Sequence, residues 1–223
     1  MTTRDALACF AAGASYTCGT VLWRALLGHV GRRSRLHWRL NCLFPTRISV
    51  GDGCEIKHDV TLDGRSAHAP AITIGDEVRI KERSTLAAYG GFIHLGRRVL
   101  VGHGTIILGH GGVIVGDDSM ISPYVIMVSS EHVASMATEP FQDQGFTRER
   151  IEIGPNVWIG GHTSVLAGTV VERDVVVGAG SVVRGVLESG WLYAGVPARQ
   201  IRRVPDSFER NVEVFKRDWG LLY

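Results

Sequence analysis

Residues 153–183 have the sequence IGPNVWIGGHTSVLAGTVVERDVVVGAGSVV, in which an aliphatic residue recurs at every sixth position. The recurring residues are Ile153, Ile159, Val165, Val171, Val177 and Val183. A helical stripe has a period of 3.6 residues and a half-buried strand has a period of two, so neither accounts for this spacing. A period of six indicates short strands that are joined by corners.

The same register covers most of the preceding chain, with interruptions between groups of three hexads. Its aliphatic members there are Val50, Ile56, Leu62, Ile74, Ile80, Leu86, Leu95, Val101, Ile107, Val115, Ile121 and Met127. Gly often follows the aliphatic residue, and a small or β-branched residue lies four positions after it. Three hexads close one triangular coil, so the repeat predicts an all-β solenoid with an aliphatic interior. Glycine at the corner is expected to relieve the backbone where the chain bends.

The register assigns residues 47–196 to the solenoid. Because the ends of a stack need covers, we expect residues 1–46 to form a helical cap and residues 197–223 to form a helical extension. The longest interruption of the repeat spans residues 128–152. A loop of that length inside a regular solenoid is usually functional, so it is the expected catalytic loop.

Composition and charge narrow the classes of function. The net charge of the 223 residues is +2, which excludes a broad basic surface for nucleic acid. The four cysteines (Cys9, Cys18, Cys42 and Cys54) form no zinc spacing, and we expect reduced, packed thiols in a cytoplasmic protein. No signal peptide fits the N-terminus. The basic cluster within residues 32–39 is interpreted as a solvated face of the cap, with peripheral membrane contact as the alternative.

The expected catalytic loop begins with Ser129, Ser130, Glu131 and His132. Imidazole has an ordinary pKa of about 6.5 and can take a proton from an attacking hydroxyl or amine at neutral pH. His132 is therefore the candidate general base, although a lone loop histidine is a weak signal. Glu131 is a candidate for orienting the base or acidifying the site, and a solvent-facing carboxylate is the alternative.

Residues 93–97, 121–123, His132 and 153–160 resemble the hexapeptide-repeat acyltransferases, in particular the galactoside and maltose O-acetyltransferase and polysaccharide-biosynthesis branch. The resemblance covers about residues 47–203. It implies a left-handed parallel β-helix, a hand that spacing alone does not give. It also implies a homotrimer, a catalytic role for His132, and acetyl-CoA or another acyl-CoA as co-substrate, with no metal and no tightly bound cofactor.

The same resemblance implies a groove between two subunits for the donor. Its candidate residues are Trp158, Gly160, Gly161, Ala179 and Gly180, with the Gly161 amide as the oxyanion donor. Arg199 and Arg202 match family positions that face the coenzyme phosphates, and guanidinium groups suit phosphate oxygens. The alternatives are corner geometry for the glycines, an interface aromatic for Trp158 and a solvated basic face for the two arginines.

One position expected to contact the acceptor differs from the sequence pattern of the family. An asparagine that helps to bind the acceptor in related sugar acetyltransferases is replaced here by Gly104, next to His103. His103 and His110 project outward in the hexad register and are candidates for acceptor contacts, with plain surface histidines as the alternative. The implied acceptor is a hydroxyl of a sugar, glycan precursor or glycosylated natural product, and an amine is the alternative.

Two other classes of function are alternatives for this sequence. A metal enzyme of the γ-carbonic-anhydrase type shares the fold, but His58 and His103 lie two coils apart at about 4.8 Å per coil, too far to share an ion. An inactive scaffold is consistent with Gly104. Retention of His132, Trp158 and the closing arginines argues against it.

Overall fold

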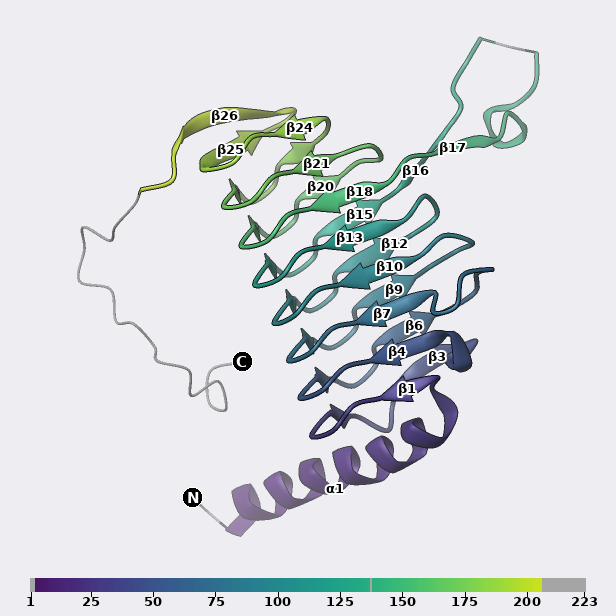
Figure 1. The fold of residues 1–223 in the computed structure, drawn as a ribbon, viewed down its shortest axis with the longest axis vertical. Helices are drawn as coiled ribbons and strands as arrows, with labels where there is room; N and C mark the ends of the chain where they lie inside the picture. Colours follow the sequence, from purple (N-terminus) through teal and green to yellow (C-terminus); the bar gives the residue numbers. More distant parts are fainter. Residues whose placement is uncertain (1–2, 137, 206–223) are drawn as a thin grey trace.

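A computed structural model describes residues 3–136 and 138–205, with side chains from residue 13 onward. The chain winds about eight times around one axis as a left-handed parallel β-helix (Figure 1). Within the described residues, three parallel sheets form the faces of a triangular prism, and nearly every turn adds one short strand to each sheet. The predicted solenoid is therefore confirmed.

The three sheets are named A, B and C in the order in which the chain enters them. Sheet A consists of β1 (His29–Val30), β4 (Ile48–Val50), β7 (Ile72–Ile74), β10 (Ile93–Leu95), β13 (Val113–Val115), β18 (Ile151–Ile153), β21 (Val170–Val171) and β24 (Val186–Leu187). Sheet B consists of β2 (Arg35–Leu36), β5 (Glu55–Ile56), β8 (Arg79–Ile80), β11 (Leu100–Val101), β14 (Met120–Ile121), β19 (Trp158–Ile159), β22 (Val176–Val177), β25 (Trp191–Gly195) and β26 (Ala198–Arg203). Sheet C consists of β3 (Asn41–Leu43), β6 (Thr61–Asp63), β9 (Thr85–Ala87), β12 (Ile106–Leu108), β15 (Ile126–Val128), β20 (Ser164–Val165) and β23 (Val182–Val183).

The predicted aliphatic columns line the inside of the prism. In sheet A, Ile74 is in register with Val50 and Leu95, and Val115 is in register with Leu95 and Ile153. These five side chains are at most 2% exposed. Burial of such side chains stabilises a fold by about 1.5–3 kcal/mol each, so the columns are the main source of its stability.

The corner glycines have a different role from the one expected. The left-handed backbone falls three positions after the aliphatic residue, as at Gly53 (φ 66°) and Asp118 (φ 62°), rather than at the glycine that follows it. A Cβ on Gly75 would lie 2.7 Å from a backbone carbon of Gly96 in the next turn. The following glycine is therefore required by the close stacking of turns, not by the bend.

The N-terminal end is covered by α1 (Thr3–Leu26), which packs on the first turn. Trp23 is buried, and its Nε1 donates a hydrogen bond to the His37 carbonyl at 3.1 Å. The solenoid begins earlier than expected, because β1, β2 and β3 form a first turn inside the segment predicted as a helical cap. Its inward residues, Val30, Leu36 and Cys42, continue the six-residue spacing.

The other end is covered by a strand instead of the predicted helix. β26 pairs antiparallel with β25 and ends sheet B. The rest of the predicted helical extension, residues 206–223, lies outside the described residues.

The cysteines differ in environment. Burial raises the pKa of the Cys42 thiol to about 12 and that of Cys54 to about 11, so both stay protonated near neutral pH. Cys18 is exposed, and the side chain of Cys9 lies outside the described part. Separately, no helix within residues 3–136 and 138–205 has the length and apolar character to cross a membrane.

Candidate active site

The loop at residues 128–152 contains an antiparallel hairpin that projects from the corner between sheets C and A (Figure 1). Its strands are β16 (Ser130–His132) and β17 (Phe146–Arg148), with the short 3-10 helix Phe141–Asp143 between them. His132 is the last residue of β16 and is paired with Phe146. The hairpin gives the candidate base a fixed position on an otherwise regular wall.

The imidazole of His132 is exposed. Its ring centroid lies 6.1 Å from that of Phe146, which is its aromatic neighbour within the described residues. Both ring nitrogens are therefore open to a ligand or to a neighbouring subunit.

Glu131 pairs with Arg184 instead of with the imidazole. Both carboxylate oxygens accept hydrogen bonds from the guanidinium, each at 3.1 Å. Successive side chains in a strand point to opposite faces, which turns Glu131 away from His132. The contact anchors the hairpin to the corner that follows β23, so the carboxylate holds the hairpin and does not touch the imidazole.

The Phe146 ring lies between His132 and His110, and Tyr89 contacts His110 as well. The His110 ring lies 6.0 Å from Phe146 and 5.1 Å from Tyr89. Burial lowers the pKa of His110, and the positive charge of Arg148 lowers it further. The lower pKa favours the neutral imidazole, and the half-buried ring of His110 does not project fully outward as expected.

The glycine-rich residues lie together at another corner, between sheets B and C. The Gly180 amide donates to the Gly161 carbonyl at 2.9 Å, so these two residues lie on adjacent turns. No described backbone oxygen accepts a hydrogen bond from the Gly161 amide. Pro123, which has no N–H, occupies the same corner position one turn earlier, and its carbonyl accepts from His162 at 3.1 Å. The Gly161 N–H thus has no backbone partner within the described part of the chain, as an oxyanion donor requires.

Gly160 and Ala179 have separate roles at this corner. A Cβ on Gly160 would lie 2.5 Å from the Ala179 backbone nitrogen, so stacking alone requires glycine there. Ala179 and Gly180 are exposed, and the space beside Gly180 is open, with no atom within 4 Å of a Cβ built there. The corner therefore leaves a smooth surface over two turns.

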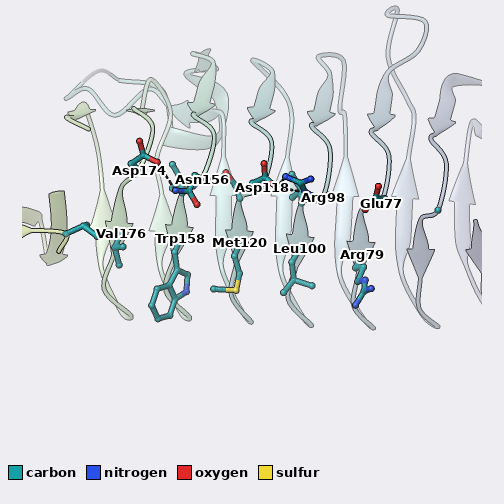
Figure 2. A pocket seen from close by; sticks show the side chains of 15 residues that line it. Glu77, Arg79, Arg98, Leu100, Asp118, Met120, Asn156, Trp158, Asp174 and Val176 are labelled. Carbon is teal, nitrogen blue, oxygen red and sulfur yellow. Dashed lines mark hydrogen bonds and ion pairs between the residues drawn. The ribbon is translucent and has the colours of Figure 1, made fainter. Parts of the chain in front are cut away.

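The outer face of sheet B continues this surface. Trp158 is 48% exposed, is paired with Met120, and donates a hydrogen bond from Nε1 to Ser122 Oγ at 2.9 Å. Figure 2 shows Arg79, Leu100, Met120, Trp158 and Val176 extending to the same side of adjacent strands. These residues line a cavity of about 740 Å³.

The closing arginines lie on the last strand of the same sheet. Arg202 is paired with Leu192, Leu192 with Val176, and Val176 with Trp158, so the four form one cross-strand column. Three strand spacings separate Trp158 from Arg202, about 14 Å in all. Arg199 is also exposed, opposite Ala194. No described carboxylate pairs with either arginine. Each guanidinium donates to a neighbouring backbone carbonyl, Arg199 to Ala198 at 3.1 Å and Arg202 to Arg203 at 3.0 Å, and keeps further N–H groups that an anion can use.

His103 and Gly104 belong to the corner between sheets B and C, not to the corner of His110. The His103 ring lies 4.8 Å from Tyr124, and both residues line a cavity of about 380 Å³. Gly104 has φ 65°, and a Cβ there would lie 2.6 Å from the Tyr124 ring. A side chain at 104 would displace Tyr124, which accounts for the glycine at this position.

Within one chain, the site residues fall into two groups. His132, Glu131 and His110 lie at the corner between sheets C and A, whereas Gly160, Gly161, Ala179, Gly180, His103 and Gly104 lie at the corner between sheets B and C. Tyr89, Phe146 and Arg148, which surround His110, were not predicted from the sequence. The available signal was the alternation of Phe146, Thr147 and Arg148 inside the loop. Among the described residues, no group of three His, Cys, Asp or Glu side chains is placed to hold a metal ion.

Comparison with known proteins adds sequence relatives. The family model "Bacterial transferase hexapeptide (six repeats)" matches residues 150–185. The probable acetyltransferase Rv3034c of Mycobacterium tuberculosis is 30% identical over 140 residues, which are 63% of this chain and 47% of that protein. The galactoside O-acetyltransferase of Escherichia coli is 31% identical over 134 residues, which are 60% of this chain and 64% of that protein. The chain thus matches about half to two thirds of the length of these relatives.

The solved structures extend the comparison of the fold. AntD, an N-acyltransferase from Bacillus cereus in complex with dTDP and 3-hydroxybutyryl-CoA, superposes with a TM-score of 0.60 at 22% identity. The match covers 85% of this chain and 89% of AntD. The repeat, the fold and the related sequences agree in their similarity to the hexapeptide-repeat acyltransferases.

Proposed function

We propose that the chain is an acyl-CoA-dependent O-acyltransferase that uses His132 as its general base. The expected donor is acetyl-CoA, and the expected acceptor is a hydroxyl of a sugar, glycan precursor or glycosylated natural product. The observation that carries the proposal is an exposed histidine held on a hairpin that interrupts the regular solenoid of this family. The relatives named as O-acetyltransferases, from Escherichia coli, favour oxygen as the attacking atom.

The proposed reaction is a direct transfer in a ternary complex. His132 takes the proton of the acceptor hydroxyl while the oxygen attacks the thioester carbonyl carbon. The Gly161 amide holds the oxyanion of the tetrahedral intermediate. When this collapses, the carbon–sulfur bond breaks, and the coenzyme A thiolate leaves and takes the proton from the imidazolium. The product is an ester, and no covalent acyl-enzyme forms.

We further propose that the complete site lies between two subunits of a homotrimer. The hairpin with His132 and the corner with Gly161 belong to different edges of the prism. If the hairpin of one subunit reaches the corner between sheets B and C of its neighbour, the base and the oxyanion donor meet. A ring of three such head-to-tail contacts gives three identical sites.

The donor is proposed to lie along the outer face of sheet B. Its pantetheine arm would pass Trp158 and the smooth corner of Gly161, Ala179 and Gly180, where backbone groups can be approached closely. Its phosphates would meet Arg199 and Arg202, because guanidinium groups form charge-assisted hydrogen bonds with phosphate oxygens.

The test is a transfer assay with acetyl-CoA and matched acceptors that differ only in an oxygen or a nitrogen, such as methyl galactoside and its amino analogue. Coenzyme A release gives the rate, and hydroxylamine lability of the product distinguishes an ester from an amide. We expect a hydroxylamine-labile ester. An amide as the main product would assign the chain to N-acyl transfer, and no transfer to either class would contradict the proposed activity.

A further inference from the structure

A second cavity, of about 520 Å³, opens beside the hairpin at the corner between sheets C and A. We call it the basic pocket and define it by Arg47, Arg65, Tyr89, His110, Phe146 and Arg148. These residues come from segments that are far apart in the sequence: the entry to sheet A, three successive corners and β17. The fold brings them together on one edge of the prism.

The basic pocket has an excess of positive charge. The pocket contains three guanidinium groups, and the charge of one of them is offset because Arg65 pairs with Asp63 at 2.6 Å. Arg47 donates instead to the backbone carbonyls of Ser66 and His68, and Arg148 lies over the Phe146 ring at 5.0 Å. Among the described residues, no carboxylate pairs with Arg47 or Arg148. Two uncompensated guanidinium groups in one cavity match a dianion.

Aromatic rings line the same pocket and lead to the candidate base. Arg65 lies over Tyr89 at 5.4 Å, and Tyr89 is followed by His110 and then Phe146. The Phe146 ring is also the contact of His132. A molecule bound to the arginines would therefore lie against aromatic faces and extend towards His132.

We propose that the basic pocket binds a phosphate group of the acceptor, so that a phosphorylated sugar places its hydroxyl beside His132. This inference rests on the proposed function for the reaction, but binding in the pocket can be measured without it. The forked guanidinium group recognises phosphate oxygens in pairs, and the rings of Tyr89 and Phe146 provide apolar faces for the sugar.

Binding is tested by calorimetry at low salt with galactose 1-phosphate, methyl galactoside and galacturonate, in the absence of acyl-CoA. We expect galactose 1-phosphate to bind at least about tenfold more tightly than methyl galactoside. Galacturonate carries one charge and should bind more weakly than the phosphate. Equal affinity of galactose 1-phosphate and methyl galactoside would overturn the inference. Tighter binding of galacturonate than of galactose 1-phosphate would also overturn it, because the pocket would then be a carboxylate site.

The variant Arg148→Gln localises the effect, and Arg150→Gln is its matched control. Arg150 is two residues away, is 51% exposed, and pairs with Glu152 outside the pocket. Arg148→Gln should weaken galactose 1-phosphate binding by about tenfold, Arg148→Lys should retain part of it, and Arg150→Gln should leave it unchanged. Equal losses in Arg148→Gln and Arg150→Gln would reduce the effect to general surface charge and overturn the assignment. Melting temperatures check that each variant is folded.

Turnover separates this inference from the proposed function. If phosphorylated and neutral sugars bind as expected but none accepts an acetyl group, the proposed function falls and the phosphate site stands. If neutral sugars are acetylated with the same kcat/KM as phosphorylated ones, the proposed function stands and the phosphate site falls. Support for both requires Arg148→Gln to raise the KM of the phosphorylated acceptor while the KM of acetyl-CoA is unchanged.

Discussion

At the scale of single residues, the surroundings of His132 leave its imidazole accessible to a substrate. The imidazole is exposed, and Phe146 covers one side of it at 6.1 Å. We expect His132→Ala to lower kcat by about a hundredfold or more, because general-base catalysis contributes that much, and to leave the affinity for acyl-CoA within a few fold. Coenzyme A release measures the rate. His94→Ala, an exposed histidine on sheet A, is the control. Near-wild-type turnover of His132→Ala would remove this residue from the mechanism.

The Gly161 amide can be deleted with a matched control. Gly161→Pro removes the N–H, and Pro123 shows that the corner accepts proline at this position one turn earlier. Gly161→Ala keeps the N–H and adds the same Cβ, at 3.1 Å from the Pro123 carbonyl oxygen. We expect Gly161→Pro to lower kcat by about a hundredfold relative to Gly161→Ala. Similar kcat values for the two folded variants would exclude the amide as oxyanion donor.

Strand register supports the proposed role of Arg202 in donor binding. It stands in the column of Trp158 and has no described carboxylate partner. Arg202→Ala should raise the KM for acyl-CoA by about tenfold with little change in kcat. A phosphate contact remote from the thioester stabilises the bound substrate and the transition state equally, so its loss weakens binding without slowing the chemical step. Arg203, which lies over the Trp191 ring at 4.1 Å, supplies the control Arg203→Ala. An increase confined to the KM of the acceptor would contradict the assignment.

Candidate site residues could be selected from the sequence where a local motif marks them, as at His132, Trp158 and Arg202, and their roles stay predictions. Arg47, Arg65 and Tyr89 could not, because each lies in a corner whose sequence has no repeat and only the stacking of turns brings them together. The partner of Glu131 was hidden for the same reason, since Arg184 is 53 residues away in the sequence.

At the scale of secondary-structure elements, the hairpin is the part of the molecule that departs from the repeat. One bidentate ion pair, between Glu131 and Arg184, ties it to the wall. Exposed ion pairs contribute about 0–1 kcal/mol to folding, so this one is expected to set the position of the hairpin more than the stability of the protein.

We therefore expect Arg184→Ala to lower kcat by about three- to tenfold with an unchanged melting temperature. Faster hydrogen exchange in residues 130–148 should accompany the loss. The exchanged pair Glu131→Arg with Arg184→Glu should recover part of the activity, which a role for Glu131 in proton transfer would not allow. A clear fall in the melting temperature of Arg184→Ala, together with its loss of activity, would show instead that the contact supports the fold.

The strands of the solenoid could be predicted wherever the six-residue spacing of aliphatic residues is clear in the sequence. The columns from Val50 to Val183 were assigned to the correct inward positions because the spacing there is dense and aliphatic. The first turn was missed because Val30, Leu36 and Cys42 are separated by arginine-rich corners. β26 was missed because it pairs antiparallel with β25 and does not follow the hexad register.

At the scale of the whole molecule, the residues of the proposed site lie on two edges of the prism, so the proposed mechanism needs a second chain to complete the site. His132 stands on the hairpin of the corner between sheets C and A, and Gly161 stands at the corner between sheets B and C. A rigid solenoid cannot bend these edges together, because each turn is hydrogen-bonded to the next along all three sheets. A cyclic arrangement of identical chains brings unlike edges into contact at every interface.

Mixed trimers test this arrangement directly. A chain with His132→Ala keeps the oxyanion corner, and a chain with Gly161→Pro keeps the base, so each homotrimer should be inactive. When the two are co-expressed in equal amounts, about a quarter of the interfaces should combine the intact hairpin of one chain with the intact corner of the other. Coenzyme A release should then recover to about a quarter of the wild-type rate. A site formed within one chain predicts no recovery, since every chain carries one defect.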